Sequence, residues 1–189
     1  APATGGPPRA LLDSVRDADW GPDGGSLAVV RVVKTADGDR RRLEYPIGRV
    51  LVESTPDSYF CLSSPRVAPG GDRVAYIDCE AASGAVEIRT VDLQGRQQRD
   101  YRGRPYSRDT AESVWGLSWA PAGDKIWFAR RQPGGLVELM ASELRGGVRR
   151  LGTLGGPLFD VSSRHEALTA VYSQRGCIVV RRSDEPAER

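Results

Sequence analysis

Three segments of the chain repeat one sequence frame, and no other feature limits the fold as strongly. They read DWGPDGGSLAVV from Asp19, RVAPGGDRVAYI from Arg66 and SWAPAGDKIWFA from Ser118. In each segment a hydrophobic residue stands two positions before a proline, and a glycine stands two positions after it. The residues that define this frame most clearly are Trp20, Pro22, Gly24, Pro69, Gly71, Trp119, Pro121 and Gly123. Self-similarity at a nearly fixed period indicates that one structural unit recurs along the chain.

Each copy of the frame predicts a β-hairpin. Proline fixes φ at the first turn position, and glycine supplies the positive φ that closes the turn. Apolar residues then alternate, as at Val74 and Tyr76, which is typical of a strand with one buried face. We expect three tryptophans at core positions of this repeat, namely Trp20, Trp119 and Trp127.

Two further strands complete each unit. A third strand ends at a second glycine, which follows each proline by a nearly constant interval, at Gly48, Gly95 and Gly146. A short outer strand is expected next, at 49–53, 97–101 and 148–153. One four-stranded antiparallel sheet cannot bury both of its faces, so such units must stack on one another. The sequence therefore predicts an all-β fold, a β-propeller of four-stranded antiparallel blades.

A weaker fourth copy runs from Phe159 to Tyr172. Ser163 stands where the proline was, His165 takes the place of the turn glycine, and Leu168 and Ala170 are expected on the buried face. Three clear blades and one degenerate blade favour an open arc of a larger propeller, because propellers typically have 4 to 8 blades. We expect a linker or incomplete preceding blade at 1–14, blades at about 15–62, 63–113, 114–156 and 157–182, and a polar tail at 183–189.

The repeats, with the D-L-Q-G and E-L-R-G-G turns that follow them, resemble the WD-like repeats of TolB-type β-propellers over residues 15–182. The fullest match is Pro22-Asp23-Gly24. The runs RRLEYPIGRVLVES and SPRVAPGGDRVAYID also resemble the C-terminal propeller, or sensor, region of certain bacterial serine/threonine protein kinases. That resemblance implies a module that binds a protein or small ligand, an extracytoplasmic (periplasmic) location and a membrane-anchored parent protein.

The chain itself shows no kinase motif. It has no G-x-G-x-x-G after a strand, no V-A-I-K-like lysine, no H-R-D and no D-F-G. We therefore expect a non-catalytic interaction or sensor module. Two alternatives stay open: the gating propeller of a prolyl-oligopeptidase-like serine hydrolase, and a free-standing TolB-like periplasmic propeller that binds proteins.

Composition argues against several classes of partner and cofactor. The 27 Lys and Arg residues nearly balance the 25 Asp and Glu residues, for a net charge of +2, so nucleic acid is not an expected partner. No apolar run approaches the roughly 20 residues of a membrane span. With three cysteines, one histidine and no C-x-x-C pair, a four-ligand zinc site is not expected. We expect no cofactor.

The best candidates for a binding surface lie in the longest segment between repeats, because loops at blade rims commonly bind partners. They are Tyr101, Arg102, Arg104, Tyr106 and Trp115.

A serine hydrolase site has weaker support. Gly116 to Ala120 matches the G-x-S-x-G/A pattern, with Asp160 and His165 as conceivable partners of Ser118. Ser118 falls within a repeat strand, however, and no helix follows to form the sharp turn of a nucleophile elbow. We therefore expect no hydrolase site there, and we expect His165 on a surface loop.

Calcium binding and a disulfide are also considered. Asp17, Asp19 and Asp23 offer carboxylates but lack the spacing of an EF-hand, and Asp23 is better explained as a turn residue that caps its own backbone. Cys61 and Cys79 flank the second hairpin symmetrically. A disulfide between them stays open, because it requires the strands to extend that far.

Overall fold

The computed structural model describes residues 10–55, 62–79, 83–104, 113–144 and 147–171. Its first sheet comprises β1 (Val15–Trp20), β2 (Leu27–Thr35), β3 (Gly38–Glu44) and β4 (Val50–Glu53). The second comprises β5 (Ser63–Val67), β6 (Arg73–Cys79), β7 (Val86–Asp92) and β8 (Gln97–Arg102). The third comprises β9 (Ser113–Trp119), β10 (Lys125–Arg131), β11 (Val137–Glu143) and β12 (Val148–Leu154). A two-stranded sheet follows, with β13 (Leu158–Val161) and β14 (Ala167–Thr169).

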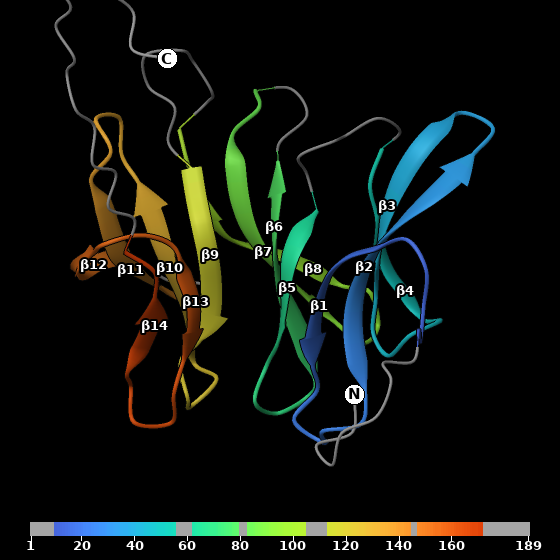
Figure 1. Ribbon diagram of the computed structural model, residues 1–189, viewed down its shortest axis with the longest axis horizontal. Helices are drawn as coiled ribbons and strands as arrows, with labels where there is room; N and C mark the ends of the chain where they lie inside the picture. Colours follow the sequence, from blue (N-terminus) through green and yellow to red (C-terminus); the bar gives the residue numbers. More distant parts are fainter. Residues whose placement is uncertain (1–9, 56–61, 80–82, 105–112, 145–146, 172–189) are drawn as a thin grey trace, which may run out of the picture.

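The four sheets are arranged as successive propeller blades (Figure 1). Each of the first three is an antiparallel meander in chain order, and the first strands β1, β5, β9 and β13 are neighbours in that order. The expected fold class is confirmed: the chain is all-β, its sheets match propeller blades, and the arc that they form is not closed.

The repeated turn keeps its geometry in all four copies. Gly24, Gly71 and Gly123 have φ of 64°, 70° and 70°, and each donates its N–H to the carbonyl three residues earlier. His165 has φ of 64° and donates in the same way to Ser162. The fourth copy therefore preserves the backbone of the turn after losing its glycine.

Replacing His165 with glycine is expected to stabilise the chain. A positive φ destabilises a non-glycine residue by roughly 1 kcal/mol, because its Cβ lies too close to the backbone. We therefore expect His165→Gly to raise the free energy of unfolding by about 0.5 kcal/mol. The gain is reduced because the variant loses the ring contact of His165 with Trp127, at 6.0 Å. Urea unfolding measures the change, and Arg164→Gly serves as the control. A control that stabilises equally would contradict the explanation.

The fourth hairpin corrects one expectation about its buried face. Its closing backbone contact joins Ser162 to Glu166, whereas the third hairpin joins Ala120 to Lys125, so the fourth turn is one residue shorter. Val161 consequently pairs with Ala167, which packs toward the third sheet, and Leu168 is 63% exposed. The expectation that Leu168 is buried was wrong, because a one-residue shift moves alternate side chains to the other face.

Hydrophobic cores lie between neighbouring blades. Leu43 and Tyr76 meet between the first and second sheets, and Ile88 and Phe128 meet between the second and third. Leu158 of the fourth sheet packs with residues of the third. Burial of these side chains is the main force that holds the blades together.

The tryptophan of the repeat frame is buried in the third copy and exposed in the first. Trp119 is 5% exposed, as expected, and Trp127 packs in the core between the third and fourth sheets. Trp20 is 59% exposed. Its expected core position was wrong for the described chain, because no described blade packs against that side of β1.

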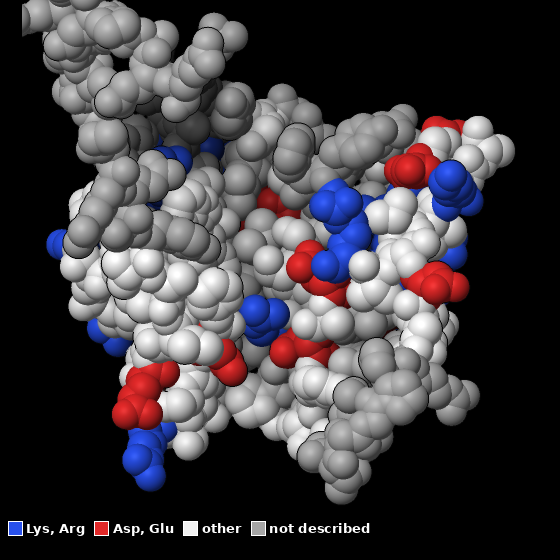
Figure 2. All heavy atoms as spheres, in the orientation of Figure 1, with Lys and Arg blue, Asp and Glu red and all other residues white. Residues whose placement is uncertain are grey.

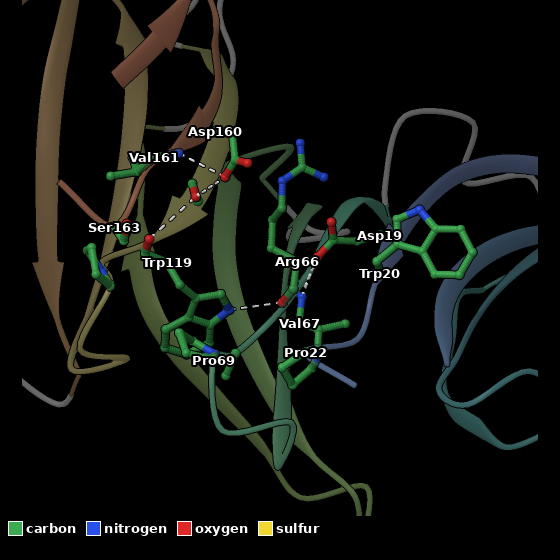
Figure 3. Close-up of a pocket in the computed structure, with 13 residues that line it drawn as sticks. Asp19, Trp20, Pro22, Arg66, Val67, Pro69, Trp119, Asp160, Val161 and Ser163 are labelled. Carbon is green, nitrogen blue, oxygen red and sulfur yellow. Dashed lines mark hydrogen bonds between the residues drawn. The ribbon is translucent and has the colours of Figure 1, made fainter. Parts of the chain in front are cut away.

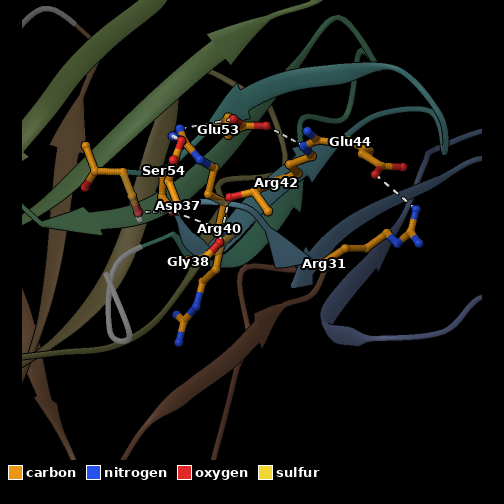
Figure 4. A network of polar contacts seen from close by, with 11 residues as sticks. Arg31, Asp37, Gly38, Arg40, Arg42, Glu44, Glu53 and Ser54 are labelled. Carbon is orange, nitrogen blue, oxygen red and sulfur yellow. Dashed lines mark hydrogen bonds and ion pairs between the residues drawn. The ribbon is translucent and has the colours of Figure 1, made fainter. Parts of the chain in front are cut away.

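Each full blade carries ion pairs between its third and fourth strands. In the first blade Arg40 and Arg42 both reach Glu53, as Figure 4 shows. The corresponding pairs join Glu87 to Arg99 at 3.0 Å in the second blade and Glu138 to Arg150 at 3.2 Å in the third. On the face in Figure 2, basic and acidic side chains are interspersed.

Candidate functional site

A pocket of about 460 Å³ lies where the first strands of the four blades end. Four residues at one repeat position line it, each directly before the hydrophobic residue of the frame. They are Asp19, Arg66, Ser118 and Asp160. Because equivalent strand positions point the same way in stacked blades, the repeat brings these side chains together.

Hydrogen bonds from these residues join one blade to another (Figure 3). Asp19 accepts the N–H of Val67 at 2.8 Å, and the Ser118 hydroxyl donates to Asp160 at 2.9 Å. The Arg66 guanidinium donates to the carbonyl of Phe159 at 3.1 Å. The site is therefore held by contacts between all four blades.

Negative charge is in excess in the pocket. The guanidinium of Arg66 lies between the carboxylates of Asp19 and Asp160 in Figure 3. Burial raises the pKa of Asp19, and the nearby charge of Asp160 adds to that rise, whereas the Val67 N–H and Arg66 oppose it. The pocket therefore offers hydrogen-bond acceptors and a fixed cation to a polar ligand.

The rim of the pocket is apolar and stiff. Pro22, Pro69 and Pro121 of the three clear repeats line it, together with the exposed ring of Trp20. Exposed aromatic rings combined with a few polar groups are typical of binding sites.

The five binding-surface candidates are not gathered in this pocket. Tyr101 is 8% exposed, and its ring lies 4.7 Å from that of Phe128, so it is part of the core. Arg102 lies 4.0 Å from Glu87, and Arg104 is exposed after β8.

The remaining two candidates lie further along the chain. Trp115 is in β9, where Arg131 stacks over its ring at 4.8 Å, and Tyr106 lies outside the described residues. A binding surface in the segment between the second and third blades stays a prediction.

Of the three conceivable hydrolase residues, Ser118 and Asp160 are in contact, whereas His165 packs elsewhere. Ser118 is 4% exposed and hydrogen-bonds directly to Asp160. The ring of His165 lies against Trp127 on the β13–β14 turn. A serine nucleophile needs a base within hydrogen-bond reach, and within the described residues the Ser118 hydroxyl is hydrogen-bonded to Asp160 and not to a histidine.

The three aspartates considered for calcium point to different partners. Asp23 accepts the N–H groups of Gly25 and Ser26, which confirms its role as a turn cap. Asp17 and Asp19 accept backbone N–H groups of β5. Within the described ranges, no group of three or more His, Cys, Asp or Glu residues is placed to hold a metal ion.

The structure does not test the disulfide between Cys61 and Cys79. Cys79 ends β6, but Cys61 lies outside the described residues, so the bridge stays a prediction. In the part of the chain that the structure describes, no helix has the length and hydropathy to cross a membrane.

Sequence reasoning missed the pocket residues as a group, although a signal was present. The position before the frame hydrophobic residue is polar in all four copies, namely Asp, Arg, Ser and Asp. An inner strand that faces a packed core would carry apolar residues there. A polar position in every copy is therefore a sign that the strands line a polar pocket.

The repeated blades, their turns and the polar inner strands define the class of protein: a β-propeller that resembles TolB in structure. Among solved structures, TolB from Acinetobacter baumannii matches with a TM-score of 0.58 and 17% identity, over 85% of this chain and 39% of that one. A TolB-type protein from Agrobacterium tumefaciens matches with a TM-score of 0.55 and 18% identity, over 75% of this chain and 47% of that one.

A peptidase is similar as well. An acylaminoacyl peptidase from Pyrococcus horikoshii matches with a TM-score of 0.50 and 10% identity, over 74% of this chain and 25% of that one. This chain spans less than half the length of each of these three proteins. No protein-family model and no curated protein sequence matches it. At these identities the likeness establishes the fold alone.

Proposed function

We propose that this chain is a non-catalytic interaction module that binds a peptide segment of a partner protein in the pocket at the ends of the first strands. One observation carries the proposal: the repeat places Asp19, Arg66 and Asp160 in one cavity whose rim holds an exposed tryptophan. An apolar side chain of a bound peptide can pack against the aromatic rim, while the polar backbone groups of the peptide form hydrogen bonds with the charged residues at the floor.

The test uses a random-peptide display library panned against the whole chain. Enriched peptides are expected to bind with micromolar affinity. Arg66→Gln is expected to weaken them at least tenfold, since a hydrogen bond to a charged group contributes about 1.5 to 3 kcal/mol and about 1.4 kcal/mol is a factor of ten. Arg73→Gln is the matched control, because Arg73 lies on the same blade and pairs with its neighbour Asp72. Peptides that respond equally to both variants, or a library without enrichment, would count against the pocket.

The parent protein proposed for this module is a bacterial serine/threonine protein kinase, of which the chain would be the extracytoplasmic sensor end. The support is the sequence resemblance of RRLEYPIGRVLVES and SPRVAPGGDRVAYID. A periplasmic location is also supported by the structural likeness to TolB. The reading frame around the encoding segment tests this proposal: a kinase domain followed by a membrane span is expected upstream.

The gating propeller of a serine hydrolase is the second candidate. The observation that favours it is the likeness to the acylaminoacyl peptidase from Pyrococcus horikoshii. It predicts a G-x-S-x-G domain encoded next to this segment. A free-standing TolB-like propeller instead predicts a secretory signal upstream and neither enzyme domain.

A further inference from the structure

A second pocket, of about 420 Å³, lies on the second blade and shares no lining residue with the pocket at the ends of the first strands. The beginning of β6, the end of β7, the β7–β8 turn and the beginning of β8 supply its walls. All of its lining residues are polar or charged, namely Arg73, Thr90, Asp92, Arg96, Gln97 and Gln98. Because the second blade supplies all of them, the blades at either end of the arc contribute nothing to this lining.

Hydrogen bonds to a buried carboxylate fix one wall of this pocket. The Thr90 hydroxyl donates to Asp100 at 2.9 Å, and the carboxamide of Gln98 donates to the same carboxylate at 2.5 Å. Asp100 is 7% exposed, and its backbone carbonyl accepts the Ser142 hydroxyl of the third blade at 2.7 Å. Side chains that are already held in place lose little conformational freedom when a ligand binds. This wall is therefore preorganised.

A buried tyrosine holds Gln97, which lines the same pocket. The hydroxyl of Tyr76, whose side chain is fully buried, donates to the carboxamide oxygen of Gln97 at 2.7 Å. This contact uses an acceptor of Gln97 and leaves its NH₂ group, which donates no hydrogen bond within the described residues. The oxygen of Thr90 keeps lone pairs that can accept a hydrogen bond. The pocket therefore offers both donors and acceptors to a ligand.

The charged side chains around this pocket compensate one another. Arg73 pairs with Asp72 at 2.8 Å, and Arg96 pairs with Asp92 at 2.6 Å. The carboxylate of Asp100 lies behind Thr90 and Gln98 and opposes the binding of an anion, whereas the two guanidinium groups oppose the binding of a cation. The lining therefore suits an uncharged ligand that has several hydrogen-bonding groups.

We propose that this pocket binds a sugar unit of a carbohydrate, at a site separate from the peptide pocket. A neutral sugar carries no charge, and each of its hydroxyl groups both donates and accepts hydrogen bonds. Such hydroxyls can accept from the NH₂ group of Gln97 and from the guanidinium groups, and they can donate to the oxygen of Thr90. Because each neutral hydrogen bond has a modest net effect, we expect a dissociation constant on the order of 1 mM.

Saturation-transfer NMR on the whole chain tests the proposal with neutral disaccharides, namely maltose, cellobiose, lactose and diacetylchitobiose. At least one of them is expected to bind. Its dissociation constant is expected to change less than about twofold when the salt concentration rises about tenfold, because salt screens charges and not neutral hydroxyls. The absence of transfer to every disaccharide would overturn the proposal. A higher affinity for inorganic sulfate than for any disaccharide would also overturn it, because the pocket would then be an anion site.

The variant Gln97→Glu assigns the binding to this pocket. Glutamate keeps an oxygen for the Tyr76 hydroxyl but lacks the NH₂ donor, so we expect the dissociation constant of the bound disaccharide to rise about fivefold. Gln94→Glu is the matched control, because Gln94 is exposed on the same turn and does not line the pocket. The control is expected to stay within about twofold of wild type. Equal effects of the two variants, or no effect of Gln97→Glu, would contradict the assignment. Peptides bound in the pocket of the first strands are expected to respond to neither variant.

Discussion

Replacing Gly116 with alanine is expected to detach the fourth blade from the third. Gly116 lies in β9 with φ of 94°, and a Cβ built on it would stand 1.9 Å from the carbonyl oxygen of Leu158 in β13. That oxygen belongs to the backbone, so no side-chain rotation can relieve the overlap. We expect the free energy that holds β13 against β9 to fall by about 3 kcal/mol, from the positive φ and from overpacking together.

Hydrogen exchange measures this loss where it occurs. Amides of β13 and β14 are expected to exchange about 100-fold faster in Gly116→Ala, since 1.4 kcal/mol corresponds to a factor of ten. Gly134→Ala is the matched control, because Gly134 has φ of 88° and no atom within 4 Å of an added Cβ. It carries the same backbone cost without the close contact. If the control accelerates exchange in β13 and β14 equally, the close approach of Leu158 is not the cause.

Replacing Glu87 with glutamine is expected to destabilise the second blade by about 3 kcal/mol, the lower end of the range for breaking a buried ion pair. The Glu87 side chain is fully buried, and its two oxygens meet Arg89 at 2.6 Å and Arg99 at 3.0 Å. Glutamine has nearly the same shape, but its NH₂ group would face a guanidinium, donor against donor. Both arginines keep some contact with solvent, which limits the loss.

Urea unfolding of Glu87→Gln and Glu143→Gln compares two glutamates that each contact two basic side chains but differ in burial. Glu143 is half exposed and meets Lys125 at 3.7 Å and Arg149 at 4.0 Å. Exposed ion pairs are typically worth less than about 1 kcal/mol, so we expect the control to change the free energy of unfolding by about 0.5 kcal/mol. Similar losses in the two variants would show that enclosure of the Glu87 carboxylate is not what matters.

The charged pair at Glu87 could not have been found from the sequence alone. Glu87 and Arg99 occur in segments rich in charge, and charged residues usually lie on the surface. Glu87 alone is buried, and its carboxylate meets arginines of β7 and β8 that come together only when the strands of the blade pair. The same holds for Asp19, whose pKa is raised chiefly by its burial in the folded chain.

The turn geometry could be predicted because it is local. Proline and glycine act on their own backbone angles, so the spacing of Pro22 and Gly24 was sufficient to place a hairpin. The same reasoning placed His165 at the glycine position, where the structure shows φ of 64°. The face of the following strand was wrong at Leu168, because the turn had lost one residue and strand faces alternate.

The sequence alone determined the repeat, the hairpins, the strand order and hence the all-β propeller class, because turn residues and period-two alternation act within a few residues of chain. Only the tertiary structure decided which copies of a repeated residue are buried. Trp20 and Trp119 have the same local sequence frame, yet one is exposed and the other enclosed. Burial is a property of the neighbouring blade, and the polar pocket arises only where four first strands meet at one point.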